Sequence, residues 1–266
     1  MAEHLSPGFV SFPDGRAALR GTAARLWRWF GGRFLHMAAE AGAEEYRFGP
    51  AIPRATLARA GYFEAFPDGA TSMSADERGT GYCLAPAVCY HAYAEFAGQR
   101  FDRPVTLTAE STCFREADRE ARSAGRLWEF TMREIVFIGA PDWVAARRDE
   151  WMSRVSDFSA SLGLEGAIEP ATDPFFGDGG RGKRLLQQVK GLKYELRLAA
   201  PPDALAVASF NLHETFFSRR FAMTLADGVD AHSACVAFGL ERWVLAFLDQ
   251  RGPTAAEALM QRDGTP

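Results

Sequence analysis

The 266-residue sequence has no apolar run long enough to form a transmembrane helix. Its first residues, MAEHLSPGFVSF, also lack the charged and apolar regions of a secretory signal. These two absences argue against a membrane-spanning or exported protein. We therefore expect a cytoplasmic protein with no membrane partner.

The sequence is also poor in cysteine and has little excess charge. Four cysteines in a chain of this length do not form a pattern typical of a disulfide framework, so we expect reduced thiols, some of them metal-bound. Thirty basic and 34 acidic side chains give a net charge of −4, which argues against a broad nucleic-acid-binding surface.

No internal repeat and no long linker divide the sequence, so we expect a single domain over residues 1–266. Helical composition covers residues 17–43, and an amphipathic pattern predicts another helix from 142 to about 163. Two strand-like runs, 105–114 and 127–139, flank a charged, turn-capable segment and predict a long antiparallel hairpin. A strand ending in polar residues follows at 204–215, and an apolar helix closes the pattern from 239 to 252.

Glu134 has an unusual place in the second run of the predicted hairpin. Period-two alternation puts it on one face with Met132, Val136 and Ile138, where an unpaired charge is costly. A metal ion would balance that charge, and thiolates from separate strands suit Zn²⁺. The alternatives are a protonated or salt-bridged glutamate and cysteines that simply fill the core.

Several strings in this sequence resemble those of a known family. CFREADREARSAGRLWEF resembles motif 2 of class II aminoacyl-tRNA synthetases, and AFGLERW resembles motif 3. RFGPAIPRATLARAGYFEAFP is similar to the dimer-forming region after motif 1. Within that superfamily the sequence most resembles the amino acid:carrier protein ligases, which are truncated relatives of zinc-dependent seryl-tRNA synthetases. The resemblance implies an α+β fold in which helices flank an antiparallel sheet, and a homodimer.

The resemblance implies an ATP site with Mg²⁺. Arginine provides a planar, permanently charged fork for phosphate. Arg115 would contact the α-phosphate and Arg242 the γ-phosphate, which makes both catalytic. The other implied ATP-site residues are Arg126 and Leu127 close to the base and the triphosphate, Phe130 beneath adenine, and Glu195 and Ser209 at Mg²⁺-bound phosphates or ribose. One position departs from the family pattern, because Ala117 stands where a glutamate is usual, between Glu116 and Asp118.

The resemblance also implies one Zn²⁺ per chain, held by Cys89, Glu134 and Cys235. The metal would bind the free amine of the amino-acid substrate in its open position, with Glu134 and Asn211 at the substrate. A small pocket around it makes glycine, alanine or serine the expected substrate. His91, His213 and His232 lack the spacing of a ligand pair, and we expect them to be core or rim imidazoles.

The sequence shows neither a tRNA-binding arm nor a sustained heptad pattern, so tRNA is not the expected acceptor. The resemblance implies the phosphopantetheine thiol of a small acidic carrier protein instead. A basic stretch could face that partner; it comprises Arg181, Lys183, Arg184, Lys190 and Lys193. The expected function is therefore amino-acid activation by ATP followed by thioester formation. Two alternatives stay open, namely a catalytically silent synthetase paralogue and a minimal seryl-tRNA synthetase-like enzyme.

Overall fold

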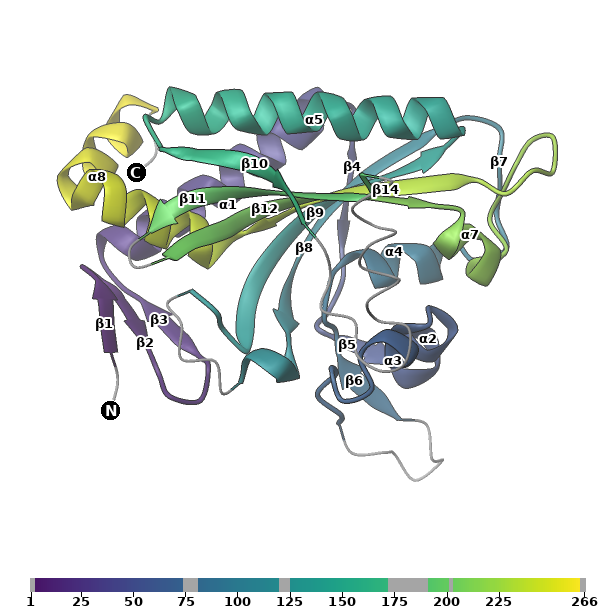
Figure 1. Cartoon of the computed structure of the whole chain (residues 1–266), viewed down its shortest axis with the longest axis horizontal. Coiled ribbons are helices and arrows are strands. Elements are labelled where there is room, and N and C mark those ends of the chain that lie inside the picture. Colours follow the sequence, from purple (N-terminus) through teal and green to yellow (C-terminus); the bar gives the residue numbers. More distant parts are fainter. Residues whose placement is uncertain (1–2, 74–80, 120–124, 172–190, 201–202, 264–266) are drawn as a thin grey trace.

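A seven-stranded sheet forms the centre of the molecule (Figure 1). The computed structural model describes residues 3–73, 81–119, 125–171, 191–200 and 203–263. In spatial order the strands are β10 (Gly166–Pro170), β11 (Lys193–Ala200), β12 (Asp203–Glu214), β14 (His232–Gly239), β9 (Glu129–Gly139), β8 (Val105–Phe114) and β4 (Glu44–Arg47). Neighbours pair antiparallel except β4, which runs parallel to β8. The α+β fold is as expected, but β4 makes the sheet mixed.

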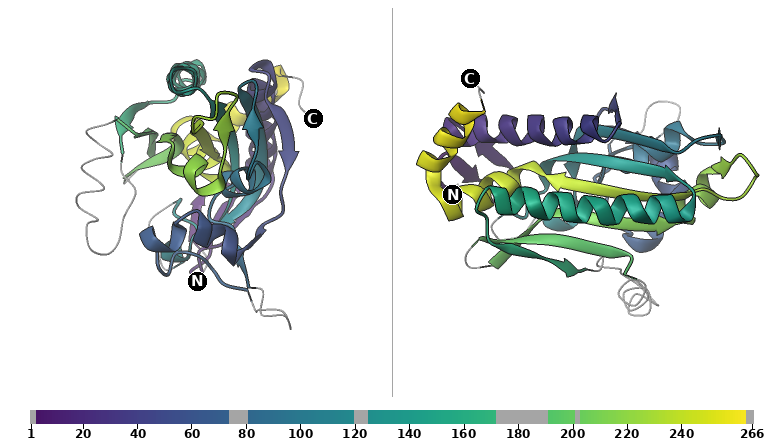
Figure 2. Two further views of the ribbon diagram at one scale, coloured as in Figure 1. Left: turned by 90° about the vertical axis from the view of Figure 1, so that its right-hand side faces the viewer. Right: turned by 90° about the horizontal axis from the view of Figure 1, so that it is seen from above.

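Three long helices cover one face of this sheet (Figure 2). They are α1 (Thr22–Glu40), α5 (Pro141–Ser161) and α8 (Leu240–Arg262). Their apolar side chains form the largest core cluster with inward-facing residues of the strands. Phe34 of α1 stacks on Phe238 of β14 with ring centroids 4.1 Å apart. This buried layer fixes the strands from behind and leaves their other face for a site.

Short elements cover only part of the opposite face (Figure 1). They comprise α2 (Arg54–Arg59), α3 (Tyr62–Ala65), α4 (Cys89–Glu95), α7 (Phe216–Phe221), the paired strands β5 (Ala51–Pro53) and β6 (Tyr82–Leu84), and the pair β7 (Arg100–Phe101) and β13 (Thr224–Leu225). Smaller apolar clusters hold α4 and α7 against β8, β9 and β14. A separate three-stranded sheet combines β1 (Glu3–Ser6), β2 (Phe9–Ser11) and β3 (Ala17–Leu19).

The predicted elements agree with this architecture except at some boundaries. The hairpin is confirmed, with β8 paired to β9 from Val105 to Phe114, although β9 begins at Glu129 rather than at residue 127. The helix predicted over 17–43 is wrong at its start, because Ala17–Leu19 pair with β2 as a strand. Gly21 lies between the strand and α1 with φ 57°, a left-handed conformation that interrupts both elements. Among the described helices, none combines the length and apolarity needed to cross a membrane.

Candidate active site

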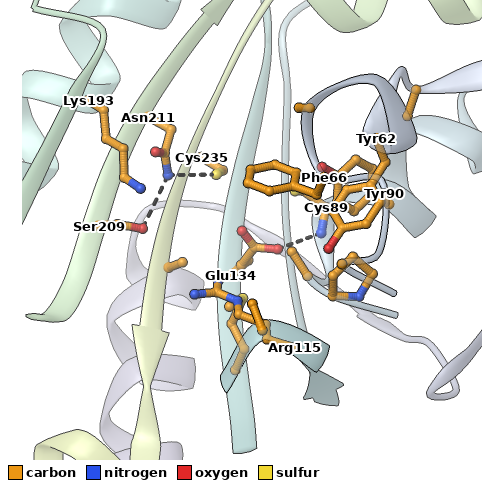
Figure 3. Close-up of a pocket in the computed structure, with 18 of the residues that line it drawn as sticks. Tyr62, Phe66, Cys89, Tyr90, Arg115, Glu134, Lys193, Ser209, Asn211 and Cys235 are labelled. Atoms are coloured by element: carbon orange, nitrogen blue, oxygen red, sulfur yellow. Dashed lines mark hydrogen bonds between the residues drawn. The ribbon is translucent and has the colours of Figure 1, made fainter. Parts of the chain in front are cut away.

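A cleft of about 1500 Å³ lies between the open part of the sheet and the short helices (Figure 3). The register of the strands explains which side chains enter it. Glu195, Ser209, Ala237 and Glu134 are successive partners across β11, β12, β14 and β9, and all four line the cleft. Because side chains alternate between the two faces of a sheet, this row puts polar groups from distant parts of the sequence side by side.

A second row, two residues further along, brings Lys193, Asn211 and Cys235 to the same face. Cys235 therefore lies one strand from Glu134 and close to it. Cys89 comes from a different element, at the first position of α4, which packs over these strands. The three residues that the sequence nominated as metal ligands thus converge at one end of the cleft.

The convergence of these three groups is close. One ligand atom from each of Cys89, Glu134 and Cys235 lies within 4.8 Å of those of the other two, and all three residues are buried. The Glu134 carboxylate accepts a hydrogen bond from the backbone N–H of Cys89. The Asn211 amide donates to Cys235 Sγ at 3.4 Å and to Ser209 Oγ at 3.2 Å. The space among the three groups has the size of a metal-coordination shell.

Burial and mutual repulsion make this cluster unfavourable when all three groups are charged. Burial raises the pKa of Glu134, although the Cys89 backbone N–H partly offsets it. The hydrogen bond to Cys235 and burial raise the pKa of the Cys89 thiol well above its ordinary value. The hydrogen bond with Cys89 lowers the pKa of Cys235, but burial and Glu134 outweigh it, so this pKa too is raised. A bound dication would reverse this balance and favour the ionised ligands.

Three arginines also line the cleft, namely Arg115, Arg126 and Arg242. Burial has the largest effect on the pKa of both Arg242 and Glu134, and the charge of Arg115 acts to lower each of the two. Arg242 is in the first turn of α8, where Nε donates to Gly125 O at 2.8 Å and a terminal nitrogen donates to Ala206 O at 3.0 Å. Burial and the nearby Arg115 lower the pKa of Arg242 to about 10, so its guanidinium stays protonated at neutral pH. Arg126 pairs with the buried Asp118 at 2.7 Å. The part of the cleft that these arginines line suits a polyanion.

The other predicted ATP-site residues divide into two groups. Glu195 and Ser209 line the cleft, as expected from their strand pairing. Leu127 is not among the cleft residues, because its side chain is buried in the main core beneath the sheet. Phe130 is not in the lining either, but the Arg115 guanidinium lies over its ring at 5.1 Å from the centroid. Phe130 therefore supports the orientation of Arg115.

Sequence reasoning missed several cleft residues. Lys193 was assigned to an exterior basic stretch, but it lines the cleft and pairs with Glu195 at 3.4 Å. The other members of that stretch, Arg181 to Lys190, lie outside the described residues. Arg197 also reaches Glu195, at 3.4 Å, and His213 contacts Cys235. Odd-numbered positions along β11 and β12 share one face, so alternation from Glu195 and Asn211 would have identified all three.

Comparison with known proteins places the chain among ligases. It is 33% identical over 250 residues to amino acid–[acyl-carrier-protein] ligase 1 of Bradyrhizobium diazoefficiens, covering 80% of this chain and 73% of that protein. The chain belongs to the amino acid–[acyl-carrier-protein] ligase family. No family model matches the sequence.

The ligase is also related to proteins named type-2 serine–tRNA ligase. It is 33% identical over 184 residues to the type-2 serine–tRNA ligase of Methanocaldococcus jannaschii. This match covers 66% of the present chain but only 35% of the M. jannaschii protein. Among solved structures, the M. kandleri SerRS in complex with A. aeolicus tRNASec matches with a TM-score of 0.82 at 23% identity, over 98% of the ligase and 60% of that chain. The fold is thus that of the class II synthetase catalytic core.

Proposed function

We propose that this protein activates a small amino acid with ATP to form an aminoacyl-adenylate and pyrophosphate, and then transfers the aminoacyl group to the phosphopantetheine thiol of a carrier protein. One observation carries the proposal. A single cleft is lined both by arginines and by a buried Cys-Glu-Cys cluster. The B. diazoefficiens relative, named an amino acid–[acyl-carrier-protein] ligase, supports this reaction type.

The part of the cleft lined by Arg115, Arg126 and Arg242 would bind ATP. Negative charge that grows on the α-phosphate during adenylation is best stabilised by cations that are already in place. Arg242 meets this requirement, because two backbone carbonyls hold its guanidinium in the cleft. Arg115 is positioned differently, with its guanidinium over the Phe130 ring. Glu195 and Ser209 are opposite each other on β11 and β12, and they would contact Mg²⁺-bound phosphates or the ribose.

The Cys-Glu-Cys cluster fits Zn²⁺. Two thiols and one carboxylate make three protein ligands, which leave a fourth position open to the cleft. When bound, the ion supplies a Lewis-acidic position for the free amine of the amino acid. Asn211 would orient Cys235 and border the substrate. The aromatic side chains of Tyr62, Tyr90 and Phe217 line the same cleft and would limit the substrate to an amino acid with a small side chain, namely glycine, alanine or serine.

Glu116 and Asp118, the carboxylates on either side of Ala117, both interact with other side chains of the protein. Ala117 is exposed in the cleft. Glu116 accepts hydrogen bonds from the Arg119 side chain at 3.0 Å and from the Trp128 indole at 3.2 Å. Asp118 pairs with Arg126. We propose that Asp118 does not contact the nucleotide itself but positions Arg126 to contact it.

Pyrophosphate exchange into ATP, measured with each amino acid in turn, tests the first half-reaction. We expect exchange that requires glycine, alanine or serine and is absent without amino acid. Mass spectrometry of a phosphopantetheinylated carrier protein tests the second half-reaction, with the unmodified carrier as the matched control. No exchange with any amino acid would contradict the proposal. Light scattering should give a mass of about twice 29.2 kDa if the expected homodimer forms.

A minimal seryl-tRNA synthetase-like enzyme is the second candidate. The relation to type-2 serine–tRNA ligases favours it, although the matched region spans only 35% of the M. jannaschii protein. Charging assays with tRNA and with carrier protein on one preparation separate the two. Serine-dependent exchange with tRNA charging and no carrier loading would select this candidate. A silent paralogue would show neither exchange nor transfer.

A further inference from the structure

His213 lies beside the Cys-Glu-Cys cluster without belonging to it. It follows Asn211 by two residues on β12, so both side chains line the cleft. His213 Nε2 is 3.8 Å from Cys235 Sγ, whereas the set of mutually close ligand atoms comprises only Cys89, Glu134 and Cys235 among the described residues. His213 therefore touches one candidate ligand rather than the whole set.

The opposite nitrogen of the same ring is also held. Nδ1 is 3.0 Å from the Tyr93 hydroxyl and 3.4 Å from Ser233 Oγ. Tyr93 and Ser233 are both fully buried. Burial raises the pKa of Tyr93 well above its ordinary value, so its hydroxyl keeps a proton to donate. Phe217 packs edge-on against the imidazole at 4.9 Å between ring centroids and limits its rotation.

These contacts fit a tautomer of His213 that carries its proton on Nε2. In a neutral imidazole one nitrogen carries the proton and the other accepts. If the Tyr93 O–H donates to Nδ1, the proton of His213 is on Nε2, directed at Cys235 Sγ. Asn211 already donates an N–H to the same sulfur. Cys235 Sγ is thus contacted by two nitrogen groups from β12, which together hold the sulfur in a single orientation.

We propose that His213 is a positioning residue for Cys235, donating its Nε2–H to the sulfur and itself fixed by Tyr93. This inference rests on the proposed metal site and adds a shell of residues that tune it. Hydrogen-bonding partners of metal ligands typically contribute about 10- to 100-fold to metal affinity. The role of His213 is therefore to set how tightly, and in what geometry, the ion is held.

Metal affinity is the first readout. We compare His213→Phe, His213→Gln and Tyr93→Phe with the wild-type chain in a Zn²⁺ competition assay with a chromophoric chelator. His213→Phe should weaken Zn²⁺ binding by about 10- to 100-fold. His213→Gln should recover much of that loss, because its amide retains an N–H donor at similar reach. Tyr93→Phe should give an intermediate loss. His232→Gln is the matched control, since residue 232 is three positions from Cys235 on β14 and faces the opposite side.

The Co²⁺-substituted proteins provide a readout that packing alone would not change. His213→Phe should shift the thiolate-to-cobalt charge-transfer band, and His213→Gln should largely restore it. Unchanged affinity and an unchanged band in a folded His213→Phe protein would overturn the inference and leave His213 a packing residue. Wild-type protein that binds neither ion would refute the metal site and this role together. Pyrophosphate exchange measured on the same preparation then tests the proposed adenylation activity independently of the metal site.

Discussion

Cys89, Glu134 and Cys235 are three buried ionisable groups, and each has a pKa raised above its ordinary value. We expect Zn²⁺ to copurify at one ion per chain, because a dication balances the charges that burial makes unfavourable. Cys235→Ser should lose most of the zinc in elemental analysis. Cys113→Ser is the matched control, since Cys113 is a buried thiol on β8 outside the cluster. Full zinc retention after changing any two of the three ligands would refute the site.

Arg115 and Arg242 should each be needed for adenylation. Loss of one fixed cation that stabilises transition-state charge typically costs about 3 kcal/mol, or on the order of a hundredfold in rate. Arg115→Ala and Arg242→Ala should lower pyrophosphate exchange to that degree while zinc content stays at the wild-type level.

Arg242→Lys separates charge from geometry. Lysine keeps the charge but lacks the planar fork that donates to Gly125 O and Ala206 O. We therefore expect an intermediate exchange rate for Arg242→Lys. Near-normal exchange in Arg115→Ala or Arg242→Ala would show that the arginines of the cleft do not bind the phosphates.

The packing of the long helices can be tested at Phe34 of α1. This ring is fully buried and contacts Phe238 of β14, Phe158 of α5 and Trp243 of α8. Phe34→Ala should lower the free energy of unfolding by about 3–5 kcal/mol, because it opens a cavity where these elements meet. Denaturant unfolding measures the change. Val229→Ala, at a side chain that is 58% exposed, should be nearly neutral. An effect below 1 kcal/mol at Phe34 would contradict this packing.

The elements that the sequence predicted well are those with regular patterns. Alternation in 127–139 predicted the face of Glu134, and the structure confirms that this residue is buried there. Ala17–Leu19 were harder, because alanine-rich strands have helical composition and only pairing with β2 makes them extended. The parallel pairing of β4 with β8 was equally hidden, since strand direction depends on long-range contacts.

The candidate site was predictable only where motifs carried it. The motifs predicted Cys89, Glu134, Cys235, Arg115 and Arg242 as site residues, and the structure brings these five into one cleft. The resemblance predicted Leu127 near the nucleotide, but this residue precedes β9 and its side chain is buried in the main core. The contact of His213 with Tyr93 joins β12 to α4, and no local pattern reports such a contact.

Metal binding should be coupled to the stability of the whole chain. A ligand that binds only the folded state stabilises it by about 2.7 kcal/mol when its free concentration is 100 times its dissociation constant. For a protein of this size, that corresponds to a rise of roughly 5–10 °C in melting temperature. Calorimetry before and after chelation should show this difference, and adding back Zn²⁺ should restore it. In Cys235→Ser the same treatment should have little effect.

The placement of the three ligands on different elements also determines how an ion would leave. Glu134 and Cys235 are on adjacent central strands, β9 and β14; β14 pairs with β9 along its whole length, and the two separate only when the sheet unfolds. Cys89 is at the start of α4, a helix of 7 residues held by side-chain packing. Local opening of α4 would remove one ligand and leave the other two in place. We therefore expect exchange of the bound ion to follow the opening rate of α4, far faster than global unfolding.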